Sequence, residues 1–280
     1  MIEERYNELI RQIAAAIATS TEELTADIEA EFAKLPTMLQ KEPGINSFIP
    51  WYRWTEKKQD GSERATKIPC SPSGSLSDVW REIPAKKENT VHFIQAYLYS
   101  RLLNGTRPEI IHREGQTAGR RTAAEGGGYG VVFSNSGLAG IDIDHCINDD
   151  GELSRNALDL IYSLDSYAEY SPSGKGIHIL VALSAPDGMK LNKNKLTARK
   201  LLEEHGDNFE PEFPEQEIEF YTDGRYFTFT GNHLTDTPDD ISAPGTMEVL
   251  DSLGFAFIPK DGATATERER TAATALDTMQ

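Results

Sequence analysis

Two aspartates, Asp142 and Asp144, stand two positions apart in the otherwise apolar stretch 137–146. In a β-strand, side chains alternate between the two faces, so both carboxylates would point to one side and Ile141 and Ile143 to the other. Carboxylates this close repel each other and are costly to bury, and a divalent cation with oxygen ligands relieves both costs. A strand end exposed to solvent would explain the pair equally well, so the Asp-x-Asp pattern by itself leaves both interpretations open.

A loop of small residues, Ser171-Pro-Ser-Gly-Lys-Gly, precedes an apolar strand that contains His178. Backbone N–H groups and a lysine in such a loop favour phosphate binding, with Ser173, Lys175 and His178 as the candidate contacts. The loop is not a Walker A motif, because Gly176 follows the lysine where Ser or Thr is required. Taken alone, a histidine on a strand is more often structural than functional.

A third candidate lies in the stretch 217–230, where Asp223 and Gly224 separate two runs of alternating residues. This pattern predicts a β-hairpin with a two-residue turn. Its polar face would carry Glu219, a candidate third metal ligand, and Glu217, which we expect to be solvated. Its apolar face would carry Ile218, Phe220, Phe227 and Phe229.

The elements that must position these residues are of mixed type. Residues 1–42 predict helices with a new start at Ser20-Thr21, and an aromatic hairpin is expected after residue 46. Further along the chain, the patterns predict a helix at 88–104, a Gly- and Arg-rich loop at 113–130, a strand at 129–134, a helix after Ser154 and a basic helix at 192–205.

The chain of 280 residues has a formal net charge of −17, which argues against coating by nucleic acid. The charge is uneven, however, because residues 190–200 carry five bases and residues 203–223 carry nine acids. Any contact with DNA is therefore expected to be confined to a basic segment of the chain.

No apolar run is long enough for a membrane span, no signal peptide is evident, and two distant cysteines form no disulfide framework, so we expect a cytoplasmic protein.

In their order, the three motifs resemble those of the archaeo-eukaryotic primase superfamily, and in particular the primase–polymerase (prim-pol) domains of phages and plasmids. The carboxylate strand around Asp142, the Ser/Gly loop running into His178 and the acid Glu219 before a Gly turn and an aromatic strand each match one family motif. The resemblance covers about residues 46–258. The family's frequent zinc-binding element is missing, because the chain has only two cysteines.

The resemblance implies an α+β fold with a primase-like catalytic core, made of an α/β part and an RRM-like part. Residues 1–45 would form an N-terminal helical appendage, residues 46–258 the catalytic domain, and residues 259–280 a linker or disordered tail.

The resemblance also implies template-directed nucleotidyl transfer in phage or mobile-element replication, within a bacterial cell. Asp142, Asp144 and Glu219 would hold two Mg²⁺ or Mn²⁺ ions. The phosphates of an incoming NTP or dNTP would contact Ser173, Lys175, His178 and, as a weaker candidate, Arg225.

Single-stranded DNA is the implied template, with the basic run 190–200 or Arg120 and Arg121 as candidate contacts and a replicative helicase as a candidate partner. Trp51 and Trp54 could stack on bases, but core packing explains them better. Two alternatives stay open: a non-catalytic DNA-binding or helicase-loading module with the same fold, and a metal-dependent nuclease or phosphoesterase.

Overall fold

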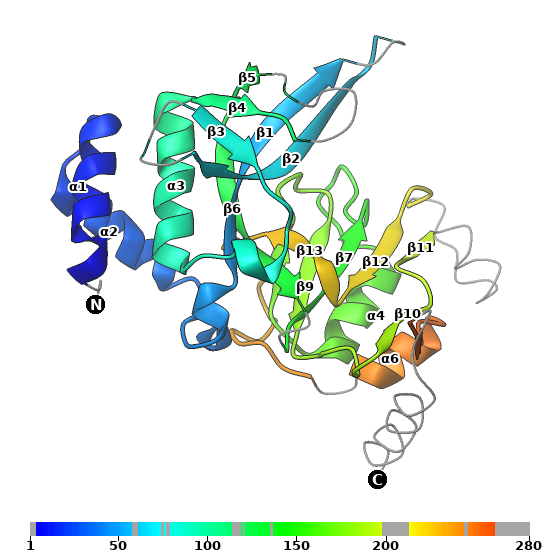
Figure 1. Cartoon of the computed structure of the whole chain (residues 1–280). Coiled ribbons are helices and arrows are strands. Elements are labelled where there is room, and N and C mark those ends of the chain that lie inside the picture. The colour runs from blue at the N-terminus through cyan, green and yellow to red at the C-terminus, as the bar shows by residue number, and fades with distance from the viewer. Residues whose placement is uncertain are drawn as a thin grey trace. The chain divides into compact units, whose positions relative to one another are not determined.

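Helices and strands are interspersed along the chain in the computed structural model, which describes residues 4–57, 61–73, 76, 79–113, 119, 121–134, 137–197, 213–243 and 246–260. The class is mixed α and β, as expected. The chain divides into a first unit, Met1–Phe133 with Gly224–Gly231, and a second unit, Ser134–Asp223 with Asn232–Gln280 (Figure 1). Within the described ranges, no helix has the length and apolar character needed to cross a bilayer.

The first unit is built on a seven-stranded sheet with the strand order β13-β6-β1-β2-β3-β4-β5. The predicted aromatic hairpin is confirmed, because β1 and β2 pair antiparallel with Tyr52 opposite Ile68. β6 is the strand expected at 129–134. The strands are β1 (Phe48–Lys57), β2 (Glu63–Pro72), β3 (Val79–Glu82), β4 (Glu109–Ile111), β5 (Arg121–Ala123), β6 (Gly127–Ser134) and β13 (Asp223–Thr228).

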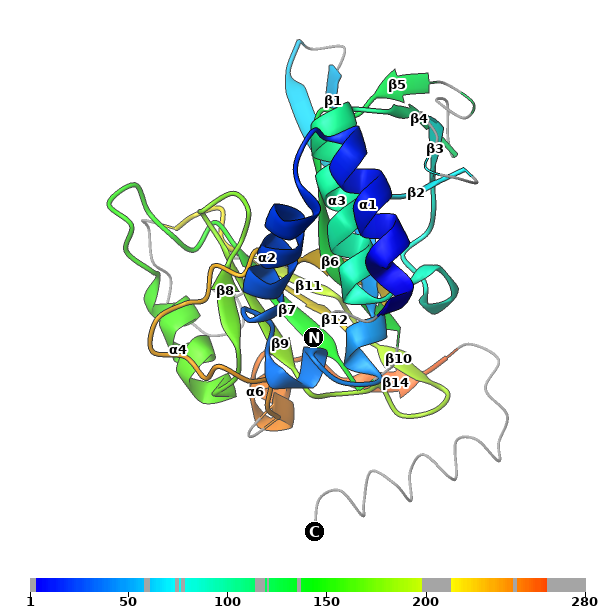
Figure 2. The same ribbon diagram turned by 90° about the vertical axis from the view of Figure 1, so that its left-hand side faces the viewer.

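In the described part of the first unit, three α-helices lie side by side (Figure 2): α1 (Asn7–Ala16), α2 (Thr21–Phe32) and α3 (Phe93–Thr106). The predicted start of α2 is confirmed, since the Ser20 hydroxyl accepts a hydrogen bond from the Glu23 N–H at 3.0 Å. Short 3₁₀ turns lie at Glu4–Tyr6, Thr37–Leu39, Gly44–Asn46 and Lys87–Asn89.

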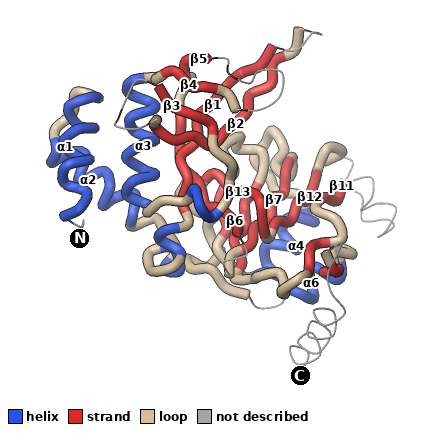
Figure 3. Tube along the Cα trace, viewed as in Figure 1, coloured by secondary structure: helices blue, strands red, loops and turns tan. Residues whose placement is uncertain are grey.

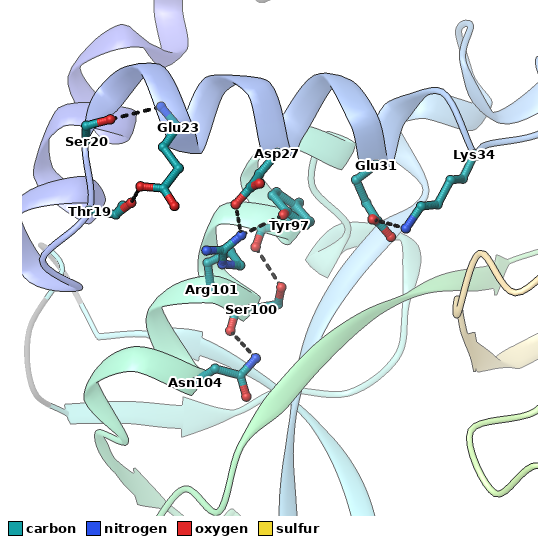
Figure 4. A network of polar contacts seen from close by, with 10 residues as sticks. All are labelled: Thr19, Ser20, Glu23, Asp27, Glu31, Lys34, Tyr97, Ser100, Arg101 and Asn104. Atoms are coloured by element: carbon teal, nitrogen blue, oxygen red, sulfur yellow. Dashed lines mark hydrogen bonds and ion pairs between the residues drawn. The ribbon is translucent and has the colours of Figure 1, made fainter.

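Polar contacts tie α2 to α3 (Figure 4). The Arg101 guanidinium contacts the Asp27 carboxylate and lies 3.0 Å from the Tyr97 hydroxyl. On the apolar side, Leu24 and Ile28 of α2 are fully buried. The N-terminal helices therefore pack into the same compact unit as the seven-stranded sheet.

The second unit contains a five-stranded antiparallel sheet with the order β11-β12-β7-β9-β8 and a separate two-stranded sheet, β10-β14 (Figure 2). Figure 3 draws β7, β11 and β12 of this unit as red strands and α4 as a blue helix. Among the described residues, the helices of this unit are α4 (Arg155–Leu164), which begins at the predicted cap Ser154, and α6 (Thr246–Ser252). The strands are β7 (Ala139–Asp144), β8 (Ala168–Tyr170), β9 (Ile177–Val181), β10 (Met189–Leu191), β11 (Lys195–Thr197), β12 (Glu217–Tyr221) and β14 (Phe257–Pro259).

One face of the five-stranded sheet is apolar and forms the core of the second unit. It packs against α4 and α6, whose buried side chains include Leu160, Ile161, Leu164 and Leu250. Each strand then presents its alternate residues on the other face. The strand residues of the core face are Ala139, Ile141, Ile143, Ala168, Ile177, Ile179, Val181, Leu196, Ile218 and Phe220.

The predicted hairpin at 217–230 is wrong. β12 pairs with β7 and β11 in the second unit, whereas β13 pairs with β6 in the first unit. The Asp223-Gly224 signal marks the place where the chain passes from one sheet to the other. The alternation was correct even so: Phe220 is buried in one unit and Phe227 in the other.

The predicted basic helix at 192–205 is also wrong where it can be compared, because residues 195–197 form the edge strand β11. The remainder of that helix, residues 198–205, lies outside the described residues, as do Arg120, residues 114–118 of the Gly- and Arg-rich loop, and residues 261–280 of the expected tail.

Candidate metal centre

Three carboxylates converge on the face of the five-stranded sheet opposite its apolar core face. β12 runs antiparallel to β7 with Glu219 opposite Asp142 and Glu217 opposite Asp144. One carboxylate oxygen each of Asp142, Asp144 and Glu219 lies within 4.8 Å of the others, and all three residues are half-buried. The structure therefore brings together the three acids that the sequence singled out as metal ligands.

The donor set fits a hard divalent cation. Like charges directly opposite each other on neighbouring strands are destabilising, and Ile141 and Ile143 hold the same strand against the core, so the carboxylates cannot simply turn away. Mg²⁺ and Mn²⁺ prefer carboxylate oxygens over sulfur or nitrogen. The nearby Cys146 adds no thiolate, because burial raises the pKa of its thiol to about 12.

His178 lies in the same row as these acids, on the neighbouring strand β9. It is directly opposite Asp142 on one side and Glu169 of β8 on the other. Its Nε2 atom lies 3.8 Å from Asp142 Oδ1 and its Nδ1 atom lies 3.7 Å from Glu169 Oε1. The predicted strand that contains His178 is confirmed, and the histidine lies between Asp142 and the more deeply buried carboxylate of Glu169.

Glu169 is a site residue that the sequence analysis missed. Its carboxylate is only 2% exposed and accepts a hydrogen bond from the Tyr167 hydroxyl at 3.1 Å. A buried carboxylate is costly unless hydrogen bonds or opposite charges stabilise it. The sequence feature that could have indicated this residue is an acid within the short apolar segment 167–170. That segment was not predicted to be a strand.

Lys195 closes the other end of the row, on the edge strand β11 directly opposite Glu219. Its ammonium contacts the Glu217 carboxylate and lies 3.5 Å from Glu219 Oε1. The hydrogen bond to Glu217 raises the pKa of Lys195 above its ordinary value. Glu217, expected to be solvated, is instead an ion-pair partner with a side chain that is 30% exposed.

The loop Ser171–Gly176 meets β7 at Asp144. A Cβ atom on Gly176 would lie 2.8 Å from the Ile143 carbonyl oxygen and 3.4 Å from Asp144 Cα, so only glycine fits without displacement. The Lys175 carbonyl accepts hydrogen bonds from the N–H groups of Cys146 and Ile147, at 3.0 and 3.2 Å. Backbone hydrogen bonds thus hold the Ser171–Gly176 loop beside the carboxylates.

The candidate phosphate contacts within this loop have local partners. The Lys175 ammonium contacts the Asn148 carbonyl at 3.1 Å and the exposed Asp149 carboxylate at 2.7 Å, which lowers the pKa of Asp149. The Ser173 hydroxyl lies 2.9 Å from that of Ser171.

Four further candidates, Arg121, Arg225, Trp51 and Trp54, belong to the first unit. Arg225 is exposed on β13 and Arg121 is exposed on β5, where it pairs with Glu109 at 3.3 Å. Trp51 donates a hydrogen bond to the Tyr129 carbonyl at 3.1 Å, and the Trp54 ring packs 4.6 Å from the His112 ring. Both tryptophans are half-buried and packed, which agrees with the structural role preferred from the sequence.

No protein-family model matches this chain. Among curated proteins, a DNA primase-polymerase of Nitratiruptor phage NrS-1 is 26% identical to it over 211 residues. The match covers 73% of this chain and 22% of the phage protein, so the chain spans about a fifth of the length of that relative. The similarity supports a relationship between this chain and a phage primase-polymerase.

Proposed function

We propose that this chain is a DNA primase–polymerase domain that adds nucleotides to a 3′-hydroxyl on a single-stranded DNA template. The observation that carries the proposal is the convergence of Asp142, Asp144 and Glu219 from two neighbouring strands, beside a loop of phosphate-binding type. The similarity to a phage DNA primase-polymerase favours nucleotidyl transfer over the other reactions that such an acid set supports.

Asp142, Asp144 and Glu219 would hold two Mg²⁺ or Mn²⁺ ions. When bound, these ions would lower the pKa of the attacking hydroxyl and neutralise the charge of the leaving pyrophosphate. The chain's own contribution is to fix the three ligands on adjacent strands. Because their backbones are paired and the opposite face is packed against α4, the carboxylates need little reorganisation when the reactants arrive.

His178, Ser173 and Lys175 would bind the triphosphate of the incoming NTP or dNTP. The ion pair between Lys175 and Asp149 is exposed, with side-chain exposures of 44% and 103%, and such pairs contribute little stability. The ammonium could therefore exchange Asp149 for a phosphate at small cost. Arg225, an exposed cation of the first unit, would be a further phosphate contact.

The template strand would bind to basic side chains, with Arg121 and the run that includes Lys190, Lys193 and Lys195 as candidates. A modest, salt-sensitive affinity is expected, because these few cations stand in a chain of net charge −17. A replicative helicase would be a partner rather than part of the site.

The experiment is primer synthesis and extension on single-stranded DNA with labelled nucleotides and Mg²⁺ or Mn²⁺. We expect products with the wild-type chain, none with Asp142→Asn or Glu219→Gln, and normal products with Asp159→Asn, an exposed acid of α4. Retained activity in the first two variants would contradict the assignment.

Two further outcomes identify the alternatives. DNA binding without incorporation would favour a non-catalytic replication module. Degradation of DNA with metal but without nucleotides would favour a nuclease.

A further inference from the structure

Four of the acids on the face opposite the core of the second unit's sheet form a block of two opposed pairs, Asp142 with Glu219 and Asp144 with Glu217. One ammonium stands at its edge, because Lys195 on β11 is directly opposite Glu219 and reaches diagonally to Glu217. β11 is an edge strand of that sheet, so this side of the block is flanked by a cation rather than by another acid.

The two oxygens of Glu219 are held from different sides. Oε2 accepts a hydrogen bond from the Tyr221 hydroxyl at 2.7 Å, and Oε1 lies 3.5 Å from the Lys195 ammonium. These contacts hold the third carboxylate in place without any metal ion. Lys195 also satisfies Glu217, whose carboxylate would otherwise add to the repulsion around Asp144.

A divalent cation among Asp142, Asp144 and Glu219 would add positive charge close to this ammonium. The cation and Lys195 are attracted by the same carboxylate, and they repel each other. The Lys195 side chain is 44% exposed, so it can move away without unpacking the core.

We propose that Lys195 is a built-in counter-ion of the acid block, which holds Glu219 in place and competes with the divalent cation for it. Lys195 thereby sets the cation concentration at which the site fills. This inference rests on the proposed function, since it concerns the metal centre proposed there. Asp142, Asp144 and Glu219 would bind the cation, whereas Lys195 would oppose its binding.

The test is direct titration of the whole chain with Mn²⁺ in the absence of DNA and nucleotide. The electron paramagnetic resonance signal of the free ion measures how much Mn²⁺ stays unbound at each step. Lys195→Gln should bind Mn²⁺ about three- to tenfold more tightly than the wild type, the range expected for removing one partly exposed charge next to a ligand. Lys195→Arg keeps the charge and should bind like the wild type.

Lys34→Gln is the matched control. Lys34 forms a similar pair with Glu31, at 2.6 Å and with a side chain that is 47% exposed, but it belongs to the first unit, whereas the acid block belongs to the second. It should leave Mn²⁺ affinity unchanged. Circular dichroism melting of each variant confirms that the fold is intact.

Equal Mn²⁺ affinity of Lys195→Gln and the wild type, together with primer synthesis by the wild type, would overturn the counter-ion role and leave the proposed function standing. Weaker binding in Lys195→Gln would overturn it as well, since it would make Lys195 a support of the metal centre. If neither the wild type nor the variants bound Mn²⁺, and none incorporated nucleotides, both the inference and the proposed function would fail.

Discussion

Glu219 lies directly opposite Asp142 on the neighbouring antiparallel strand, with a carboxylate oxygen within 4.8 Å of one on Asp142 and one on Asp144. At an effective dielectric constant of about 20, two such charges repel by about 3 kcal/mol before solvent screening reduces the value. The fold places three carboxylates close together despite this repulsion. A cation bound between the oxygens would turn the repulsion into attraction, which is the physical basis of the predictions that follow.

Asp144→Asn should abolish Mn²⁺ binding and reduce incorporation about a hundredfold or more, because one ligand and one charge are lost. In the absence of metal, the same variant should melt at the same or a higher temperature than the wild type, since a like-charge contact with Glu217 and Asp142 is relieved. Calorimetry with and without Mn²⁺ measures both effects. A variant that melts lower without metal would show that Asp144 supports the fold rather than the site.

His178→Ala should raise the KM for nucleotide and leave Mn²⁺ affinity within about twofold of the wild type, if His178 binds phosphates rather than metal. Steady-state kinetics and metal titration together separate the two roles. Loss of Mn²⁺ binding in His178→Ala would instead make the histidine a metal ligand or a support of Asp142, from which its Nε2 atom lies 3.8 Å away.

Leu24→Ala should destabilise the first unit by about 2–5 kcal/mol, because Leu24 of α2 is fully buried. Urea unfolding followed by tryptophan fluorescence is the measurement, since Trp51, Trp54 and Trp80 all lie in this unit. Glu29→Ala, an exposed position of the same helix, is the control. An unchanged tryptophan transition in Leu24→Ala would mean that residues 1–45 are an independent appendage.

Both cysteines should be unreactive in the native protein. Burial raises the pKa of Cys146 to about 12 and also raises the pKa of Cys70. A thiol whose pKa is raised by folding makes its full contribution to the free energy of unfolding at a pH below its unfolded-state pKa of about 9. This contribution declines as the pH rises toward the pKa of the thiol in the folded state. At pH 8, a thiol reagent should modify neither cysteine natively and both in guanidinium chloride. Rapid native labelling of Cys146 would contradict its burial.

Local patterns were enough to predict much of this molecule. The alternation around Ile141 and Ile143 placed both aspartates on one face, and Ser20 and Ser154 marked the helix starts that the structure has. These features depend on neighbours within a few residues, so the sequence carries them directly. The same alternation put Glu219 on the polar side of its strand, and that orientation survived although the predicted partner strand was wrong.

Only the tertiary structure decided which strands are neighbours. Residues 217–221 and 223–228 pair with different sheets, so the Asp223-Gly224 signal predicted a turn between strands that never pair with each other. The hairpin pattern encodes a local turn, whereas the competing pairings of β12 with β7 and of β13 with β6 depend on burial of Phe220 and Phe227 in two separate cores.

The same long-range pairing brought Glu169 and Lys195 to the two ends of the acid row. The apolar segment around Glu169 and the basic run around Lys195 are visible in the sequence, but the role of each residue follows from the residue opposite it on the next strand. The sequence by itself thus determined which side chains face the site, and the register between distant strands determined which of them meet.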